Sequence, residues 1–375
     1  MEAFLAFILS AKKALDNLGS HKNLHLVLGN ESCDLDSTVS ALSLAFLIHS
    51  QNSTKNADYL VIPVLNVEAK YFPLRTEICY LLKKYGIDPN ILIFKDQIEY
   101  TKVLKGRKVK TSIVDHHVLS SNDKILEKTV VQIFDHRTIN SQEICQNKNI
   151  EKILITTVGS CATLIANEII ESKVPILFNE LCQLLYATII YDTIGLDKEC
   201  GKTFEEDMMI AQHLENILKP TESRKELFDV LWKIHNDTSS LSTKDLLYRD
   251  LKVVKGVPMP GLPLLVEDYL KRPDADVAIT AFAKEFNNPS VVLIGIDASK
   301  EVKRDVAIFS TDASFKESLT HILKNSKEIA GCDLSLSEVA TKNKNVVCFR
   351  QGNIKLTRKF ILPLVDRAAG QVTKK

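Results

Sequence analysis

Short apolar runs alternate with longer segments of helical periodicity through the first half of the chain. The strand-like runs span 24–30, 59–66, 91–96, 109–117 and 130–136, and the helix-like segments span 38–50, 75–86 and 162–172. The apolar segment 180–192 follows them, and its last residues also form a strand-like run. This alternation predicts an α/β domain with a mainly parallel sheet that is flanked by helices on both faces. In such sheets ligands bind outside the carboxyl ends of the strands. The polar residues that follow these runs are therefore the first candidates for a functional site.

The pattern changes after about residue 218, where a polar stretch begins. Breaks of this kind mark linkers, so we expect a domain boundary near 220–226, with a first domain over 1–220 and a second over 227–375. A chain of 375 residues with 45% hydrophobic content can support two separate cores.

The second domain is predicted to be a smaller α+β unit. A helix is expected over 315–326, and the last strands are expected over 344–352 and 360–365. No internal repeat interrupts this pattern.

Composition argues against several kinds of partner. Lys and Arg total 48 against 47 Asp and Glu, so the net charge of +1 gives no long-range attraction to nucleic acid or to an anionic membrane. No apolar run approaches the roughly 20 residues that span a bilayer. The eight cysteines are scattered, which favours reduced thiols over disulfides or a zinc site. The first residues predict an amphipathic helix rather than a signal peptide, hence a cytoplasmic location with mitochondria as the alternative.

Acidic, amide and imidazole side chains stand at the ends of four apolar runs, the last of which spans 187–195. The candidate residues are Asn30, Asp34, Asp36, Asp115, His116, His117, Asp135, His136, Arg137 and Asp192. Because parallel strands end at one edge of a sheet, these side chains are expected to gather there.

Asp34 and Asp36 lie two residues apart before a predicted helix, so they can face two adjacent cations. Crowded carboxylates repel each other unless they are protonated or neutralised by metal. Divalent cations about 3.5–4 Å apart, with a bridging carboxylate and a shared hydroxide, suit phosphoryl hydrolysis. Alternatively, Ser37 or Asp36 is only a helix N-cap, since an isolated D-x-D or D-H-H is common in caps and loops. Four such sites in one domain favour the metal site.

Four motifs, in this order and spacing, resemble those of the DHH phosphoesterase superfamily, specifically its prune and exopolyphosphatase branch. They are "GNESCDLDSTVSA" (29–41), "VDHH" (114–117), "FDHR" (134–137) and "IIYD" (189–192). The segment "LTRKFILP" (356–363) resembles the S-R-K-x-x-x-x-P signature of the associated C-terminal domain in family II inorganic pyrophosphatases and exopolyphosphatases. The resemblance spans nearly the whole chain. It implies a DHH domain, a DHH-associated substrate-binding domain and an active site in the cleft between them.

The resemblance also implies a role for each candidate. One cation would be held by Asn30, Asp34 and Asp115. The other would be held by Asp36, Asp115, His136 and Asp192, with Asp115 bridging the two. Asp135 would orient His136. The catalytic set would be Asp115 with His116 and His117, the two histidines forming a layer that faces the substrate.

Two positions depart from the pyrophosphatase pattern, because Asn30 and Arg137 stand where that family has histidines. A neutral amide oxygen is a harder ligand, which shifts the metal preference from Mn²⁺ or Co²⁺ towards Mg²⁺. Arg137 can bind phosphate bidentately but cannot donate a proton at ordinary pH. We therefore expect recognition of a phosphoanhydride without fast pyrophosphate hydrolysis.

In the second domain, Arg358 and Lys359 match the family's phosphate-binding pair and Lys252 matches a further substrate lysine. Together with His117 and Arg137 they form the expected substrate-binding set. Arg350 and Lys355 are weaker candidates for the same role.

The expected activity is metal-dependent hydrolysis of short-chain inorganic polyphosphate, such as tri- and tetrapolyphosphate, by in-line attack of a hydroxide between two cations. The cofactors would be two divalent cations, Mg²⁺ or Mn²⁺, with Co²⁺ as a further candidate. Two alternatives stay open. One is a cyclic-nucleotide phosphodiesterase, an activity attributed to prune proteins. The other is a slow-turnover protein that acts mainly by binding a regulatory protein partner.

Overall fold

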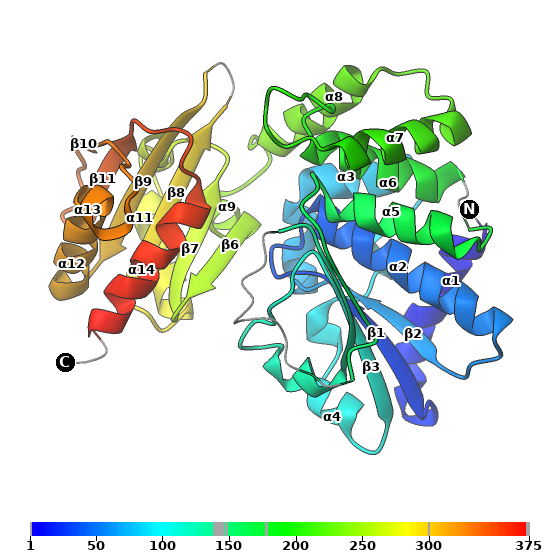
Figure 1. The fold of residues 1–375 in the computed structure, drawn as a ribbon. Helices are drawn as coiled ribbons and strands as arrows, with labels where there is room; N and C mark the ends of the chain where they lie inside the picture. Colours follow the sequence, from blue (N-terminus) through cyan, green and yellow to red (C-terminus); the bar gives the residue numbers. More distant parts are fainter. Residues whose placement is uncertain (1, 138–146, 148, 177–178, 299–300, 373–375) are drawn as a thin grey trace. The chain divides into compact units, whose positions relative to one another are not determined.

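The computed structural model describes residues 2–137, 147, 149–176, 179–298 and 301–372 (Figure 1). Contacts divide the chain into two compact units, Met1–Ile234 and His235–Lys375. The sequence predicted the boundary earlier, over 220–226, but helix α8 (Arg224–Asn236) begins within that stretch and continues beyond it. Its buried residues Leu227 and Leu231 pack in the core of the first unit. Helix α8 therefore completes the first unit instead of opening the second.

The first unit contains a five-stranded sheet of order β2-β1-β3-β4-β5, in which every pair of neighbours is parallel. The strands are β1 (Asn23–Leu28), β2 (Leu60–Val64), β3 (Lys108–Val114), β4 (Val130–Asp135) and β5 (Lys152–Ile155). This arrangement confirms the predicted α/β class. All five carboxyl ends lie at the same edge of the sheet, because the strands are parallel.

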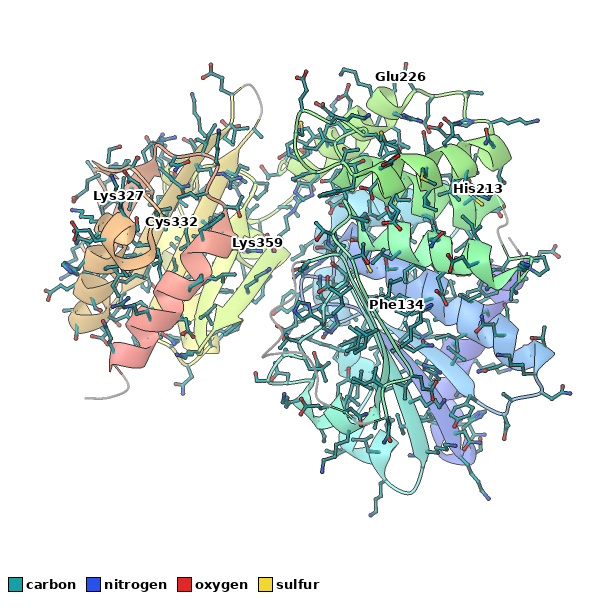
Figure 2. All side chains as sticks on the ribbon, viewed as in Figure 1. Phe134, His213, Glu226, Lys327, Cys332 and Lys359 are labelled. Atoms are coloured by element: carbon teal, nitrogen blue, oxygen red, sulfur yellow. The ribbon has the colours of Figure 1, made fainter. Side chains whose placement is uncertain are left out.

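Helices cover the sheet of the first unit, as Figure 1 shows. They are α1 (Glu2–Ala14), α2 (Leu35–Thr54), α3 (Thr76–Lys84), α4 (Tyr100–Leu104), α5 (Cys161–Ser172), α6 (Asn179–Asp192), α7 (Glu205–Leu218) and α8. Along β1, Val27 points to the core shared with α2, α5 and α6, whereas Leu26 points to the opposite core. Phe134 on β4, labelled in Figure 2, is fully buried in the first of these cores. The alternation along the strands thus feeds two separate hydrophobic layers.

The second unit contains a six-stranded sheet of order β10-β11-β9-β8-β7-β6. Its strands are β6 (Asp250–Val254), β7 (Val257–Leu262), β8 (Ser290–Asp297), β9 (Lys303–Ser310), β10 (Leu336–Val339) and β11 (Val346–Gln351). Only the β7–β8 pair is parallel among these neighbours. The helices are α9 (Thr243–Arg249), α10 (Val266–Tyr269), α11 (Ala275–Glu285), α12 (Ala313–Lys324), α13 (Ser326–Ala330) and α14 (Arg358–Val372). The α+β class is confirmed.

One element of the second unit was predicted wrongly. The apolar run 360–365 was expected to be a strand, but it lies inside helix α14. The buried residues Ile361, Leu364, Val365 and Ala368 recur at helical spacing and pack in the core of this unit. A six-residue window is too short to reveal that period. Among the described residues, no helix is both long and apolar enough to cross a membrane.

Truncating Leu231 to Ala tests whether α8 belongs to the first core. Leu231 is fully buried, so the variant should lose about 2–5 kcal/mol of unfolding free energy. The chain has a single tryptophan, and it stands in α8 at Trp232, stacked on Phe228. Urea unfolding followed by its fluorescence therefore reports on this helix directly. The neighbouring Val230→Ala is the matched control, because Val230 is 38% exposed. Equal losses in the two variants would contradict the assignment of α8 to the core.

Candidate metal and phosphate site

The loop after β1 is shaped by a close backbone approach at Gly29. A Cβ atom at this position would lie 2.2 Å from Ser37 Oγ, so only glycine fits without rearrangement. The Asn30 N–H donates to the same Ser37 Oγ at 2.7 Å. The Asn30 Oδ1 accepts the N–H groups of Ser32 and Cys33 at 2.8 and 3.2 Å, which closes a tight turn. This turn carries the chain into α2.

Helix α2 begins at Leu35, three residues before the helix-like segment 38–50 that the sequence predicts. Asp34 is the N-cap, because its Oδ1 accepts the Ser37 N–H at 3.0 Å. Asp36 therefore lies in the first helical turn, and its side chain is buried. The two interpretations of this segment, a helix N-cap and a metal site, are compatible. Asp34 caps the helix, and the Asp36 carboxylate is available for other partners.

The carboxylate of Asp36 is bound by the N-terminus of α5. The Cys161 N–H donates to Oδ2 and the Ala162 N–H donates to Oδ1, both at 2.7 Å, and the Ser40 hydroxyl donates to Oδ1 at 3.1 Å. The first N–H groups of a helix have no intrahelical partners and favour an anion. Asp36 is thereby fixed in orientation by a helix that starts 125 residues further along the chain.

Asp115 follows β3 with a left-handed backbone, φ +60°, and its N–H donates to Phe134 O at 2.8 Å. Its Oδ1 lies 3.3 Å from both His136 Nε2 and Arg137 Nη2. Its Oδ2 accepts a hydrogen bond from Asn30 Nδ2. Asp115 is therefore the point where the groups from β1, β3 and β4 converge.

Asn30 presents its amide nitrogen to Asp115, because its amide oxygen is held by the turn described above. In this arrangement the amide supports the Asp115 carboxylate as a hydrogen-bond donor.

Asp135, the last residue of β4, orients the two neighbouring motifs. Its Oδ2 lies 2.5 Å from His117 Nδ1, and its Oδ1 accepts the backbone N–H groups of His136 and Arg137 at 2.8 and 3.3 Å. The expected contact with the His136 ring is not the one the structure has. The His136 ring is instead oriented by Val158 O, 3.1 Å from Nδ1. A carbonyl can only accept, so Nδ1 carries the proton and Nε2 faces the acidic groups.

His116 is buried, and its Nδ1 lies 2.8 Å from Val114 O. Burial lowers the pKa of this imidazole, which favours its neutral form. His117 is the more accessible of the pair, with 11% of its side chain exposed.

Asp192 was expected after a strand, but it is the last residue of helix α6. Its Oδ2 is buried and has no hydrogen-bond partner among the described residues. Burial, reinforced by the charges of Asp36 and Asp34, raises the pKa of this carboxyl well above its usual range. A buried carboxylate oxygen without a partner is costly unless a cation or proton neutralises it.

The same electrostatic problem affects the other carboxylates. Burial, with the charges of Asp34 and Asp36, raises the pKa of Asp115 to about 7, and burial also raises the pKa of Asp36. Burial lowers the pKa of His136, but the neighbouring carboxylates outweigh this and raise it to about 10. These groups stabilise positive charge between them.

The residues fit a divalent cation. One ligand atom each from Asp36, Asp115 and His136 lies within 4.8 Å of the others. Carboxylate oxygens and an imidazole nitrogen are suitable ligands for Mg²⁺, Mn²⁺ or Co²⁺.

Asp207 supports the site through the start of α5, and it is not among the residues predicted from the sequence. Asp207 is fully buried and accepts the Gly159 N–H at 2.8 Å, the Thr163 hydroxyl at 2.6 Å and the Phe204 N–H at 2.9 Å. It thus holds the start of α5, the helix that binds Asp36. Its partners in the first turn of α5 and just before it lie 44 and 48 residues away, so no local pattern marks this contact.

The candidate substrate residues of the second unit come from two elements. Lys252 lies on β6, whereas Arg358 and Lys359 open α14, where Figure 2 labels Lys359. Arg358 Nη2 donates to Asp250 Oδ1 at 2.7 Å. Of the weaker candidates, Arg350 is paired with Glu267 and Lys355 is exposed in the loop before α14.

Two comparisons define the class of the fold. The DHHA2 domain family matches residues 229–368. The whole structure is similar to a crystal structure described as a "putative family II inorganic pyrophosphatase" from Methanococcus jannaschii. The TM-score is 0.61 at 20% identity, and the match covers 92% of this chain and 99% of the other. At that identity the similarity establishes a shared fold.

Sequence relatives then identify the family. Exopolyphosphatase PRUNE1 of Homo sapiens is 33% identical over 357 residues, covering 94% of this chain and 77% of the relative. The PRUNE1 exopolyphosphatase of Bos taurus is 32% identical over the same shares. The chain belongs to the prune and exopolyphosphatase branch of the DHH phosphoesterase superfamily.

Metal-dependent stabilisation tests the carboxylate cluster. Mn²⁺ or Mg²⁺ at about 100 times its dissociation constant should stabilise the protein by about 2.7 kcal/mol and raise Tm accordingly. Asp115→Asn should abolish most of this shift in differential scanning calorimetry, because it removes the central carboxylate. Asp58→Asn, which neutralises an exposed carboxylate of the same unit, should keep it. A full metal shift in Asp115→Asn would exclude Asp115 as a ligand.

Proposed function

We propose that the protein is a metal-dependent phosphohydrolase that releases terminal phosphate from short-chain inorganic polyphosphate. The observation that carries the proposal is the cluster of two buried carboxylates, Asp36 and Asp115, with the partly buried His136 at the carboxyl edge of the parallel sheet. The exopolyphosphatase names of the mammalian relatives, at 32–33% identity, support the same class of substrate.

The proposed metal centre would hold two divalent cations. Asp36, Asp115, His136 and Asp192 would hold one of them, and Asp34 with Asp115 would hold the other. Asn30 holds the shared carboxylate through its amide nitrogen. When bound, the cations lower the pKa of a water molecule and offset the charge that develops on the phosphoryl oxygens.

The imidazole of His117 is the proposed proton-handling group. Asp135 fixes its Nδ1, which leaves Nε2 for a phosphate oxygen. Arg137 is one-third exposed and already lies beside Asp115, so its remaining N–H groups can bind a phosphate next to the metal centre. In the second unit, Arg358, Lys359 and Lys252 would neutralise further phosphates of the polyphosphate substrate. A set of several cations favours binding of short linear polyanions over binding of a phosphate monoester.

A phosphate-release panel tests the proposal. Tripolyphosphate, tetrapolyphosphate, pyrophosphate and cyclic AMP are each assayed with Mg²⁺, Mn²⁺ and Co²⁺, and after chelation by EDTA. We expect turnover of tri- and tetrapolyphosphate, slower turnover of pyrophosphate, and loss of activity with EDTA. Asp115→Asn should lower kcat by at least about 1,000-fold, since it removes electrostatic stabilisation of the transition state.

The controls separate this proposal from its alternatives. Asp58→Asn should keep wild-type kcat, as an exposed carboxylate of the same unit. Full activity of Asp115→Asn on every substrate would refute the metal mechanism. Turnover of cyclic AMP alone would instead establish the phosphodiesterase, and no turnover of any substrate by the metal-loaded protein would leave the binding role of a slow-turnover protein.

A further inference from the structure

The Arg358 guanidinium is held mainly by Asp250, through its backbone oxygen and its carboxylate. Its Nη1 donates to the backbone oxygen of Asp250 and its Nη2 donates to Oδ1 of the same residue, both at 2.7 Å. A third, longer contact joins Nη1 to Met259 O at 3.5 Å. Asp250 therefore binds the outer edge of the guanidinium, the edge formed by Nη1 and Nη2.

The opposite edge of Arg358 has no partner within the part of the chain that the structure describes. Three of the five guanidinium N–H groups are used by the contacts above, and Nε–H and the second Nη2–H have none among the described residues. The Nε and Nη2 donors form the fork that binds a carboxylate or phosphate through two parallel hydrogen bonds. The Arg358 side chain is 15% exposed, so this edge is partly shielded from water.

Gly261 makes room for this arrangement. It pairs with Asp250 across the β6–β7 ladder. A Cβ atom on it would lie 2.7 Å from Asp250 Oδ2 and 2.8 Å from Arg358 Nη1. The Asp250 carboxylate and the Arg358 guanidinium thus pack against the backbone of Gly261, in the space that a side chain there would fill.

The ion pair between Asp250 and Arg358 contributes little to the free energy of unfolding. Asp250 is 47% exposed, and ion pairs in contact with water add little to the free energy of unfolding. Its effect is to hold a long side chain in one orientation. A fixed guanidinium loses less conformational entropy when it binds an anion.

We propose that Asp250 is a positioning residue, which holds Arg358 so that its Nε–Nη2 edge receives a phosphate group of the polyphosphate substrate. The inference rests on the proposed function, which assigns Arg358 to substrate. Asp250 acts through Arg358 and does not touch the substrate itself.

Steady-state kinetics on tripolyphosphate tests this role. Asp250→Asn should raise KM about 10-fold and leave kcat within about 2-fold, because a misoriented guanidinium weakens binding of ground state and transition state alike. Arg358→Gln should raise KM by a larger factor, about 10- to 100-fold, as expected for a lost charge-assisted hydrogen bond. In the double variant, Asp250→Asn should add nothing to the effect of Arg358→Gln.

Two measurements separate positioning from a general structural role. The Tm of Asp250→Asn should stay within about 2 °C of the wild type. Asp366→Asn is the matched control, because Asp366 is 48% exposed and pairs with Lys255 in the same unit. This control should leave both KM and kcat unchanged.

The outcomes distinguish this inference from the proposed function. An unchanged KM in Asp250→Asn, with a raised KM in Arg358→Gln, overturns the positioning role and keeps Arg358 on the substrate. An unchanged KM in Arg358→Gln overturns both the positioning role of Asp250 and the assignment of Arg358 to the substrate. Turnover of tripolyphosphate in the same assay would still support the proposed phosphohydrolase activity. Additive effects in the double variant, or a large loss of Tm in Asp250→Asn, would also refute positioning through Arg358.

Discussion

The structure of the first unit depends on keeping several carboxylates buried side by side. Burial and mutual repulsion both oppose the ionised forms of Asp36, Asp115 and Asp192, and each has a raised pKa. Such an arrangement persists only where the surrounding structure supplies compensating groups. The site must therefore be explained by the groups that hold the carboxylates as well as by the carboxylates themselves.

The negative charge of each carboxylate is offset by different groups. Asp36 accepts hydrogen bonds from two backbone N–H groups of α5. Asp115 accepts a hydrogen bond from the Asn30 amide and lies beside His136 and Arg137. Asp192 keeps a buried oxygen that none of the described residues contacts by a hydrogen bond. The compensation is thus uneven, and the remaining negative charge is concentrated where Asp192 and Asp115 approach His136. Local energetic deficits of this kind are typical of functional sites, where a bound ligand completes the interactions.

Much of this organisation could be predicted from sequence because it follows strand ends. Asn30, Asp115 and His136 each come within two residues of the end of a parallel strand, and the topology alone brings them together. Asp192 was placed after a strand, but it ends a helix. Its apolar neighbours are buried on all sides, so periodicity cannot distinguish the two structures. The support from Val158 and Asp207 was not predictable, because both contacts join segments distant in sequence.

The binding of Asp36 by α5 also has a consequence for how the domain folds. The two partners are separated by 125 residues, and four strands of the sheet lie between them in the chain. Contacts of such high sequence separation require prior closure of a long loop and form slowly. The Asp36 carboxylate therefore acquires its final geometry only when α5 has docked. A nascent chain that ends before α5 would contain the motif at 29–41 without the partner that orients its second aspartate.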